Sequence, residues 1–286
     1  MEYAVHIEGL SKFYKDFSLK NVDLALPQGS IMGLIGENGA GKSTVIKSML
    51  DIVKRDSGTV RILGRDMDAD AKSIKEQIGV VLGESHFHEF MNAMQISNML
   101  GAIYKSWDQE LYLDSLRRFS LPEKKKLKEY SKGMMMKLSI VAALSHHPRL
   151  LILDEATSGL DPVVRDEILD ILFEFIEDGE RSILISSHIT SDLDKVADYI
   201  TLIHQGQILF TQEKDSLMED MGLVKCSREE LDRLQGLDIV GMRRSAYQTE
   251  CLIRNRLAVQ ERYHELVIDR ANIEEIMLFY IRGQKT

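Results

Sequence analysis

The sequence has few cysteines and no excess of basic charge, and each shortage excludes a class of protein. Its 286 residues include 2 cysteines, Cys226 and Cys251, which are far apart and match no metal-ligand spacing. Such usage is typical of a reducing compartment, where cysteines pack as ordinary side chains; a disulfide between the two is the alternative. The formal net charge of −9 argues against a general nucleic-acid-binding protein.

Long apolar runs are also missing. No stretch approaches the roughly 20 continuous apolar residues that cross a bilayer. Residues 1–4 lack a basic region followed by an apolar one, so we expect no secretory signal. With 44% hydrophobic residues, the chain is long enough to bury a full-sized core and a further subdomain or small appendage.

The most informative stretch is residues 31–44, where an apolar run leads into a glycine-rich turn and then a helical pattern. Its spacing matches G-x-x-x-x-G-K-[ST] in the strand–loop–helix context of a phosphate loop. Glycines let backbone N–H groups converge, and the helix N-terminus favours an anion. We expect Lys42 to reach the β- and γ-phosphates and Ser43 to ligate Mg²⁺. The whole candidate loop comprises Gly36, Glu37, Asn38, Gly39, Ala40, Gly41, Lys42, Ser43 and Thr44.

Residues 1–28 alternate in places between apolar and polar side chains, which predicts antiparallel strands with one solvated face. Between them, residues 11–17 predict a loop that carries aromatic rings. A ring there is placed to stack on an adenine, because every base has a π-face. Tyr14 is our candidate, with Phe13 or Phe17 as substitutes; the other interpretation is that these rings fill the core of the sheet.

From Gly83 to about Pro148 the pattern becomes helical and rich in methionine, so we expect a helical subdomain at about residues 84–148. The methionines fit either adaptable packing or a pliable groove for a partner helix. Ser131 and Gly133 stand at the start of the last apolar helix of this segment. A capping serine at a helix N-terminus predicts a second anion site, distant in sequence from the first.

Two further apolar runs end in polar side chains. Residues 150–153 lead into Asp154 and Glu155, and residues 183–185 lead to His188. In open α/β sheets, ligands bind at the carboxyl ends of the strands. Neighbouring side chains on a strand point opposite ways, so Asp154 suits the Mg²⁺ shell through water and Glu155 suits polarising the attacking water. His188 is placed to reach the γ-phosphate; the alternative is a structural histidine.

Together these motifs resemble those of the ATP-binding subunit of ABC transporters, over roughly residues 2–215. The resemblance implies an α/β P-loop NTPase (RecA-like) core with an antiparallel β subdomain and an inserted helical subdomain. It assigns the family signature to residues 131–134, the magnesium carboxylate to Asp154, the general base to Glu155 and the switch histidine to His188. Residues 158–161 would be the dimer-contact loop, and Asp161 would contribute to the nucleotide site.

The chain departs from the family pattern at two places. Tyr130-Ser131-Lys132-Gly133-Met134 stands where Leu-Ser-Gly-Gly-Gln is usual, and it keeps the serine and one glycine for the γ-phosphate. Lys132 adds a positive charge to which the sequence assigns no role. Where the family has glutamine after the strand at residues 78–82, this chain has Gly83 and then Glu84, and we take Glu84 as a substitute metal ligand.

The family's mechanism implies ATP and Mg²⁺ as cofactors and a second nucleotide-binding subunit, either another copy or a paralogue. ATP on Lys42 of one subunit would be closed by Ser131 and Gly133 of the other. We also expect separate membrane-spanning subunits, which would hold this chain at the cytoplasmic face of the membrane. They would dock around residues 83–94, where Phe87 and Phe90 either contact the partner or pack inward. No nucleic-acid partner is expected.

Residues 216–286 lie beyond the shared core, so we divide the chain into an ATPase domain at 1–215 and a C-terminal extension at 216–286. Strands at 237–240 and 251–253 and a final helix predict a small α+β extension. It is either an appendage or a dimer-stabilising or regulatory element. Similar tails in ABC subunits of bacterial drug and peptide exporters favour ATP-driven export. The alternative is a soluble ABC ATPase or an ATP-dependent regulator not coupled to transport.

Overall fold

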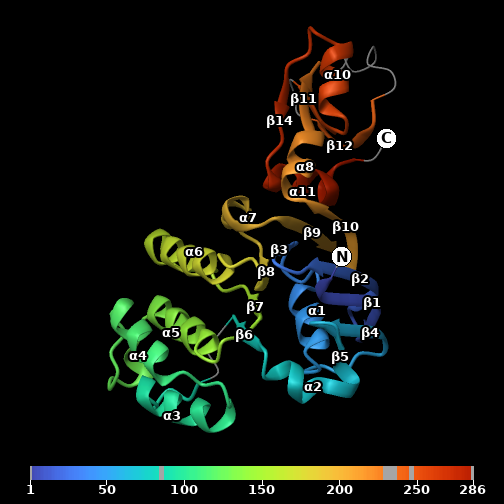
Figure 1. Cartoon of the computed structure of the whole chain (residues 1–286). Coiled ribbons are helices and arrows are strands. Elements are labelled where there is room, and N and C mark those ends of the chain that lie inside the picture. The colour runs from blue at the N-terminus through green and yellow to red at the C-terminus, as the bar shows by residue number, and fades with distance from the viewer. Residues whose placement is uncertain (1, 84–86, 228–236, 245–247, 285–286) are drawn as a thin grey trace.

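The computed structural model describes residues 2–83, 87–227, 237–244 and 248–284, and within this part the strands form three sheets (Figure 1). The central sheet has the order β10-β9-β3-β8-β7-β6. Neighbours from β9 to β6 run parallel, and β10 closes the sheet as an antiparallel hairpin with β9. The six strands are β3 (Ile31–Ile35), β6 (Ile78–Leu82), β7 (Leu150–Asp154), β8 (Ser182–Ser187), β9 (Tyr199–His204) and β10 (Gln207–Glu213).

The strands β3, β7 and β8 are buried at every position, as their continuous apolar runs predict for parallel strands covered on both faces. Register pairs Ile35 with Ser187 and Asp154 with Ser186. The carboxyl ends of the phosphate-loop strand, the carboxylate strand and the histidine strand therefore meet at one edge of the sheet.

The two faces of the central sheet support different layers, because side chains alternate along each strand. On one face the cluster includes Ile31, Ile183 and residues of α6 and α7. On the other it includes Met32, Leu184 and residues of α1 and the antiparallel sheet. The flanking helices are α1 (Lys42–Met49), α6 (Pro162–Ile176), α7 (Thr190–Val196) and α8 (Lys214–Asp220).

The antiparallel sheet has the order β2-β1-β4-β5, which confirms the strands predicted for residues 1–28. The aromatic loop is shorter than predicted, because β1 continues to Phe13, whose partner in β2 is Ser18. Asp56 supports this extra length by accepting from the Phe13 N–H at 2.7 Å. The elements are β1 (Tyr3–Phe13), β2 (Ser18–Pro27), β4 (Ser57–Ile62), β5 (Arg65–Asp66) and the following helix α2 (Met67–Lys75).

A helical subdomain is inserted between β6 and β7 and forms a lobe of its own (Figure 1). It has a separate apolar cluster around Ile96, Tyr112, Leu116 and Leu138. Its helices are α3 (Ala93–Ile103), α4 (Gln109–Arg118), the short 3₁₀ helix η1 (Leu127–Glu129) and α5 (Lys132–Leu144). No helix in the described ranges is long and apolar enough to cross a bilayer.

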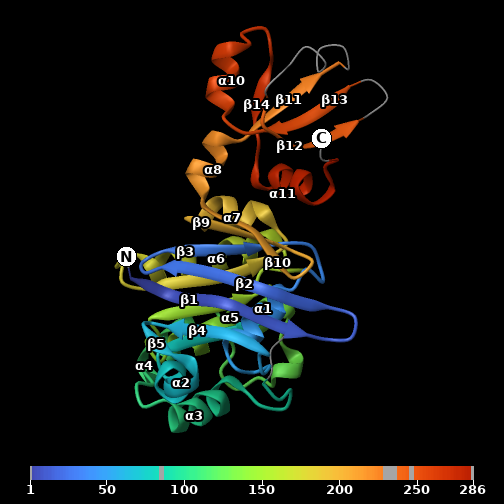
Figure 2. The same cartoon turned by 90° about the vertical axis from the view of Figure 1, so that its right-hand side faces the viewer.

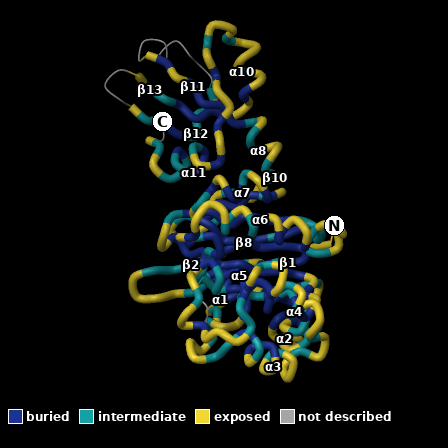
Figure 3. The backbone as a smooth tube through the Cα atoms, turned by 90° about the vertical axis from the view of Figure 1, so that its left-hand side faces the viewer, coloured by how far each residue is buried: buried dark blue, intermediate teal, exposed yellow. Residues whose placement is uncertain are grey.

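The C-terminal extension forms the third sheet, of order β12-β13-β11-β14, beyond β9, β10 and α7 (Figure 2). The predicted final helix is confirmed, whereas the strand expected at 237–240 begins at Ile239 and continues to Arg244. Buried residues follow the strands of the central sheet and of this third sheet (Figure 3). The elements are β11 (Gly222–Cys226), β12 (Ile239–Arg244), β13 (Thr249–Ile253), α10 (Arg256–Arg262), β14 (Ile268–Arg270) and α11 (Ile273–Arg282).

Both cysteines lie in this extension, and both are buried and outside any disulfide, as the composition predicts. Burial raises the pKa of Cys251 to about 12. The thiol therefore stays protonated at neutral pH, and a protonated thiol is a poor nucleophile.

Candidate active site

The phosphate loop passes close under the β9–β10 hairpin, and this close passage requires glycine. A Cβ on Gly36 would collide with the carbonyl oxygen of Ile203. Gly41, the N-cap of α1, has a φ of +116°, which side-chain-bearing residues rarely adopt. The Gly206 N–H in the hairpin also donates to the Ala40 carbonyl at 2.9 Å. Tertiary packing thus holds the loop in shape ahead of the first turn of α1.

Lys42 begins α1 and is 5% exposed, so its ammonium group is held within the loop. Its Nζ donates to the Gly36 carbonyl at 2.8 Å and to the Glu37 carbonyl at 3.3 Å. The same Nζ lies 3.0 Å from Oε1 of Glu155. The charge of Lys42 is therefore directed to the point where the loop meets the end of β7.

Glu155 links Lys42 to His188. Its Oε2 lies 2.6 Å from Nδ1 of His188, while Oε1 contacts Lys42. The backbone of Glu155 has a φ of +55°, a left-handed conformation that is rare for this residue type. Its N–H donates to the carbonyl and the Oγ of Ser186, both at 3.1 Å, which holds this turn in place. The structure therefore brings together three residues that the sequence predicted from separate motifs.

Asp154 is the last residue of β7 and is 5% exposed. Its Oδ1 accepts a hydrogen bond from Ser186 Oγ at 2.5 Å, which fixes the orientation of the carboxylate. Across the described residues, no group of three or more histidine, cysteine or acidic side chains could hold a metal ion. A cation at Asp154 would therefore need oxygen ligands from other sources, and Mg²⁺ commonly takes them from phosphates and water.

A cavity of about 600 Å³ lies over the phosphate loop, large enough for a nucleotide. Phe17 lines it, and Tyr14 is not among the lining residues. Tyr14 is 46% exposed, and its ring centre lies 6.4 Å from that of Phe17. The ring beside the cavity is thus one of the two substitutes. The lining consists of Asp16, Phe17, Glu37, Asn38, Gly39, Gly41, Lys42, Ser43, Thr44, Glu155, Ser158 and His188.

The signature lies elsewhere in the chain. Ser131 is the N-cap of α5, and its Oγ accepts from the Met134 N–H at 3.2 Å. Ser131 and Lys132 line a different cavity of about 290 Å³, beside Gly83 at the end of β6. Gly133 packs against Val164 of α6. One chain therefore does not bring Ser131 and Gly133 to its own phosphate-loop cavity.

Lys132 and Asp161 both take part in the surface around the signature. A Cβ on Gly159 would lie 2.6 Å from Lys132 Nζ, so the lysine reaches over the predicted dimer-contact loop. Asp161 caps α6, where its Oδ1 accepts from the N–H groups of Val163 and Val164. It is not among the residues lining the phosphate-loop cavity. Glu84, the proposed substitute metal ligand, lies outside the described residues.

Three residues at the site were missed by sequence reasoning. Ser186, which orients Asp154, precedes His188 at the end of a predicted strand, so its position in the sequence could have revealed it. Asp16 lines the cavity from the predicted aromatic loop. Arg282, whose Nη2 lies 2.8 Å from Oε1 of Glu37, carries no sequence signal, since it comes from the far end of the chain.

Comparison with known proteins identifies the family. Residues 19–158 match the ABC transporter family. The bacitracin transport ATP-binding protein BcrA of Enterococcus faecalis is 34% identical over 216 residues, which cover 73% of this chain and 69% of the relative. The lantibiotic transport ATP-binding protein SrtF of Streptococcus pyogenes is 35% identical over 216 residues, which cover 73% of this chain and 90% of the relative.

Solved structures agree with this assignment. The structure of an ATP-binding subunit of an ABC transporter aligns with a TM-score of 0.68 and 25% identity, over 75% of this chain and 91% of the other. An ATP-binding cassette of an ABC transporter in its ADP conformation shares the fold, with a TM-score of 0.63 and 23% identity. The alignment covers 74% of this chain and 92% of the other. The chain thus belongs to the ABC transporter family, as a nucleotide-binding subunit of the type that hydrolyses ATP to power transport.

Proposed function

We propose that this chain works as one half of a head-to-tail ATPase dimer that drives export of a drug or peptide-like substrate through separate membrane subunits. The contact chain from Lys42 through Glu155 to His188 carries the enzymatic part of the proposal. The export part is supported by relatives named for the transport of bacitracin and of lantibiotics. These names favour a transporter over an ABC ATPase or regulator not coupled to transport.

Each member of the contact chain has a distinct chemical task. Lys42 places a positive charge where the β- and γ-phosphates would lie, and so offsets the charge that develops as the terminal phosphoryl group leaves. The Glu155 carboxylate orients the attacking water and accepts its proton. His188 holds Oε2 of that carboxylate at 2.6 Å and lines the same cavity, so it positions the base and would contact the γ-phosphate.

Ser43 and Asp154 are the residues that we propose to hold Mg²⁺. When bound, Mg²⁺ neutralises charge on the β- and γ-phosphate oxygens. Ser43 lines the cavity directly after Lys42, and Asp154 ends the neighbouring carboxylate strand with its Oδ1 fixed by Ser186. Such a sparse protein ligand set fits a cation that keeps several waters and phosphate oxygens as ligands.

A second subunit would complete the site. In one chain, Ser131 lines a cavity separate from that of the phosphate loop, although both motifs are needed around one ATP in the proposed mechanism. Two-fold pairing would place Ser131 and Gly133 of one subunit over the phosphate loop of the other, with residues 158–161 at the contact. ATP would then close the dimer, and loss of the γ-phosphate would open it.

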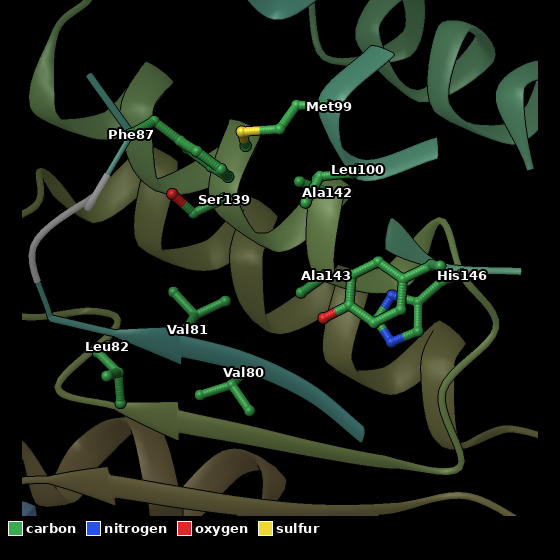
Figure 4. A pocket seen from close by; sticks show the side chains of 11 residues that line it. Val80, Val81, Leu82, Phe87, Met99, Leu100, Ser139, Ala142, Ala143 and His146 are labelled. Carbon is green, nitrogen blue, oxygen red and sulfur yellow. The ribbon is translucent and has the colours of Figure 1, made fainter. Parts of the chain in front are cut away.

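The membrane subunits would dock on the groove between β6 and the helical subdomain (Figure 4). Phe87 lines this apolar cavity of about 330 Å³, whereas Phe90 is 53% exposed beneath the ammonium groups of Lys126 and Lys128. Phe87 is therefore part of the proposed groove itself, and the exposed ring of Phe90, three residues further along the chain, is accessible to a partner. Docking here would hold the chain at the cytoplasmic face of the membrane. The lining is Val80, Val81, Leu82, Phe87, Met99, Leu100, Tyr104, Ser139, Ala142, Ala143 and His146.

The test is to express tagged Glu155→Gln chain in its native cell, solubilise the membranes gently and identify the proteins that co-purify. We expect a polytopic membrane protein and a dimeric complex that persists with ATP. A Phe90→Asp variant in the same background should lose the membrane partner while still binding ATP. Recovery without any membrane protein would overturn the transport proposal and favour the ATPase not coupled to transport.

A further inference from the structure

The C-terminal extension packs directly on the ATPase core through α11. Ile273, Ile276 and Phe279 of this helix belong to the same apolar cluster as Leu193 of α7 and Leu202 of β9. The rings of Phe210 and Tyr280 also lie 4.9 Å apart across the junction. Because buried apolar contacts join the two parts, α11 has a defined position relative to the central sheet.

The backbone of Arg282, the last residue of α11, is held in position by contacts of the residues before it and after it in the sequence. Before it, the helix is anchored in the shared cluster and starts with a capping box of Asn272 and Glu275. After it, the Gly283 N–H donates to the Phe279 carbonyl, and Gln284 pairs with Met242 of β12 through two backbone hydrogen bonds. A positive charge in the last turn of a helix is also favoured by the helix dipole.

Arg282 contacts the phosphate loop across 245 positions of sequence. Its Nη2 donates to Oε1 of Glu37 at 2.8 Å. The Glu37 carbonyl in turn accepts from Lys42 Nζ at 3.3 Å and from the Ala40 N–H at 3.1 Å. One loop residue therefore connects the extension to the lysine that serves the phosphates.

The contact between Arg282 and Glu37 matters for nucleotide binding because Glu37 carries a negative charge. Glu37 lines the cavity that holds the nucleotide, and an uncompensated carboxylate there repels phosphates. Arg282 offsets that charge and fixes the side chain. We propose that Arg282 is a positioning residue through which the C-terminal extension sets the affinity of the phosphate loop for ATP. This inference rests on the binding of ATP at the phosphate loop.

The test is the dependence of ATP hydrolysis by the full chain on ATP concentration, at low salt. Arg282→Gln should raise the KM for ATP by about two- to fivefold, the range of a solvent-exposed ion pair, and leave kcat within about twofold. Arg282→Lys should retain most of the wild-type KM. In a Glu37→Gln background, Arg282→Gln should have no further effect, because its partner charge is gone.

Arg270→Gln, on β14 of the same extension, is the matched control and should keep the wild-type KM. The effect of Arg282→Gln should shrink at about 0.5 M salt, which screens exposed charges. An unchanged KM in Arg282→Gln, or an equal increase in the Glu37→Gln background, would overturn the inference while leaving the ATPase function intact. Failure of the wild-type chain to bind ATP would instead refute the assignment of the phosphate loop.

Discussion

Replacing Glu155 by glutamine tests the proposed catalytic centre most directly. The substitution keeps the size of a side chain that is 22% exposed, and it removes the charge between Lys42 and His188. The amide has no basic oxygen of carboxylate strength, so it cannot accept the proton of the attacking water. The contacts of the phosphate loop itself are left in place.

The structure sets the size and direction of two effects. Loss of a general base lowers kcat by about 10²- to 10⁴-fold, or roughly 3–5 kcal/mol of transition-state stabilisation. Affinity for ATP should increase. In wild type, Lys42 must give up its 3.0 Å contact with the Glu155 carboxylate in order to contact the phosphates, and Glu155→Gln removes that charged contact. A charged hydrogen bond contributes about 1.5–3 kcal/mol, so we expect ATP to bind at least about tenfold more tightly.

The assay combines phosphate release, ATP titration and gel filtration with ATP. We expect Glu155→Gln to hydrolyse at most about 1% as fast as wild type, bind ATP more tightly and elute as a dimer. Glu177→Gln, on the exposed end of α6, is the control and should match wild type in all three measurements. Turnover above about 10% of wild type would refute the role of Glu155 as the base.

Three further outcomes follow from the structure. Lys42→Ala should weaken ATP binding by about 100-fold or more in a nucleotide titration, because the buried ammonium is held by the loop carbonyls at the place where it would contact the phosphates. Undiminished affinity would contradict the assignment of the phosphate loop. Burial lowers the pKa of His146 below 6.5, so the unfolded chain binds the proton first and the free energy of unfolding falls as pH drops below about 6.5, by at most about 1.4 kcal/mol per pH unit. Urea titrations at several pH values give the free energy of unfolding at each pH. In His146→Gln this free energy should fall less steeply as the pH drops below about 6.5 than it does in wild type. Cys251 should react with iodoacetamide at pH 8 only after unfolding, because its pKa is raised to about 12.

The chemical parts of the site were predictable from sequence because each lies within one short segment. The phosphate loop needs only a strand, a glycine-rich turn and a helix, all within residues 31–50. Asp154, Glu155 and His188 follow apolar runs that are typical of buried parallel strands, and such strands bring their carboxyl ends to one edge. The family then follows from the order of these segments.

The choice of aromatic ring could not be made from local sequence. Tyr14, Phe13 and Phe17 are equivalent in composition, and which of them lines the cavity depends on where β1 ends. That point is set by pairing with β2 and by Asp56, 43 positions away from Phe13. Phe17 therefore reaches the cavity as a result of strand register and not of residue type.

The sequence by itself thus determined the phosphate loop, the carboxylates, the histidine and the family, since these depend on local patterns and strand ends. Tertiary structure alone decided that Lys42, Glu155 and His188 form one contact chain, that Phe17 lines the cavity in place of Tyr14, and that Arg282 reaches Glu37. The physical reason is that a contact between distant residues depends on how layers pack and which rotamers they allow, and no local pattern in the chain encodes that packing.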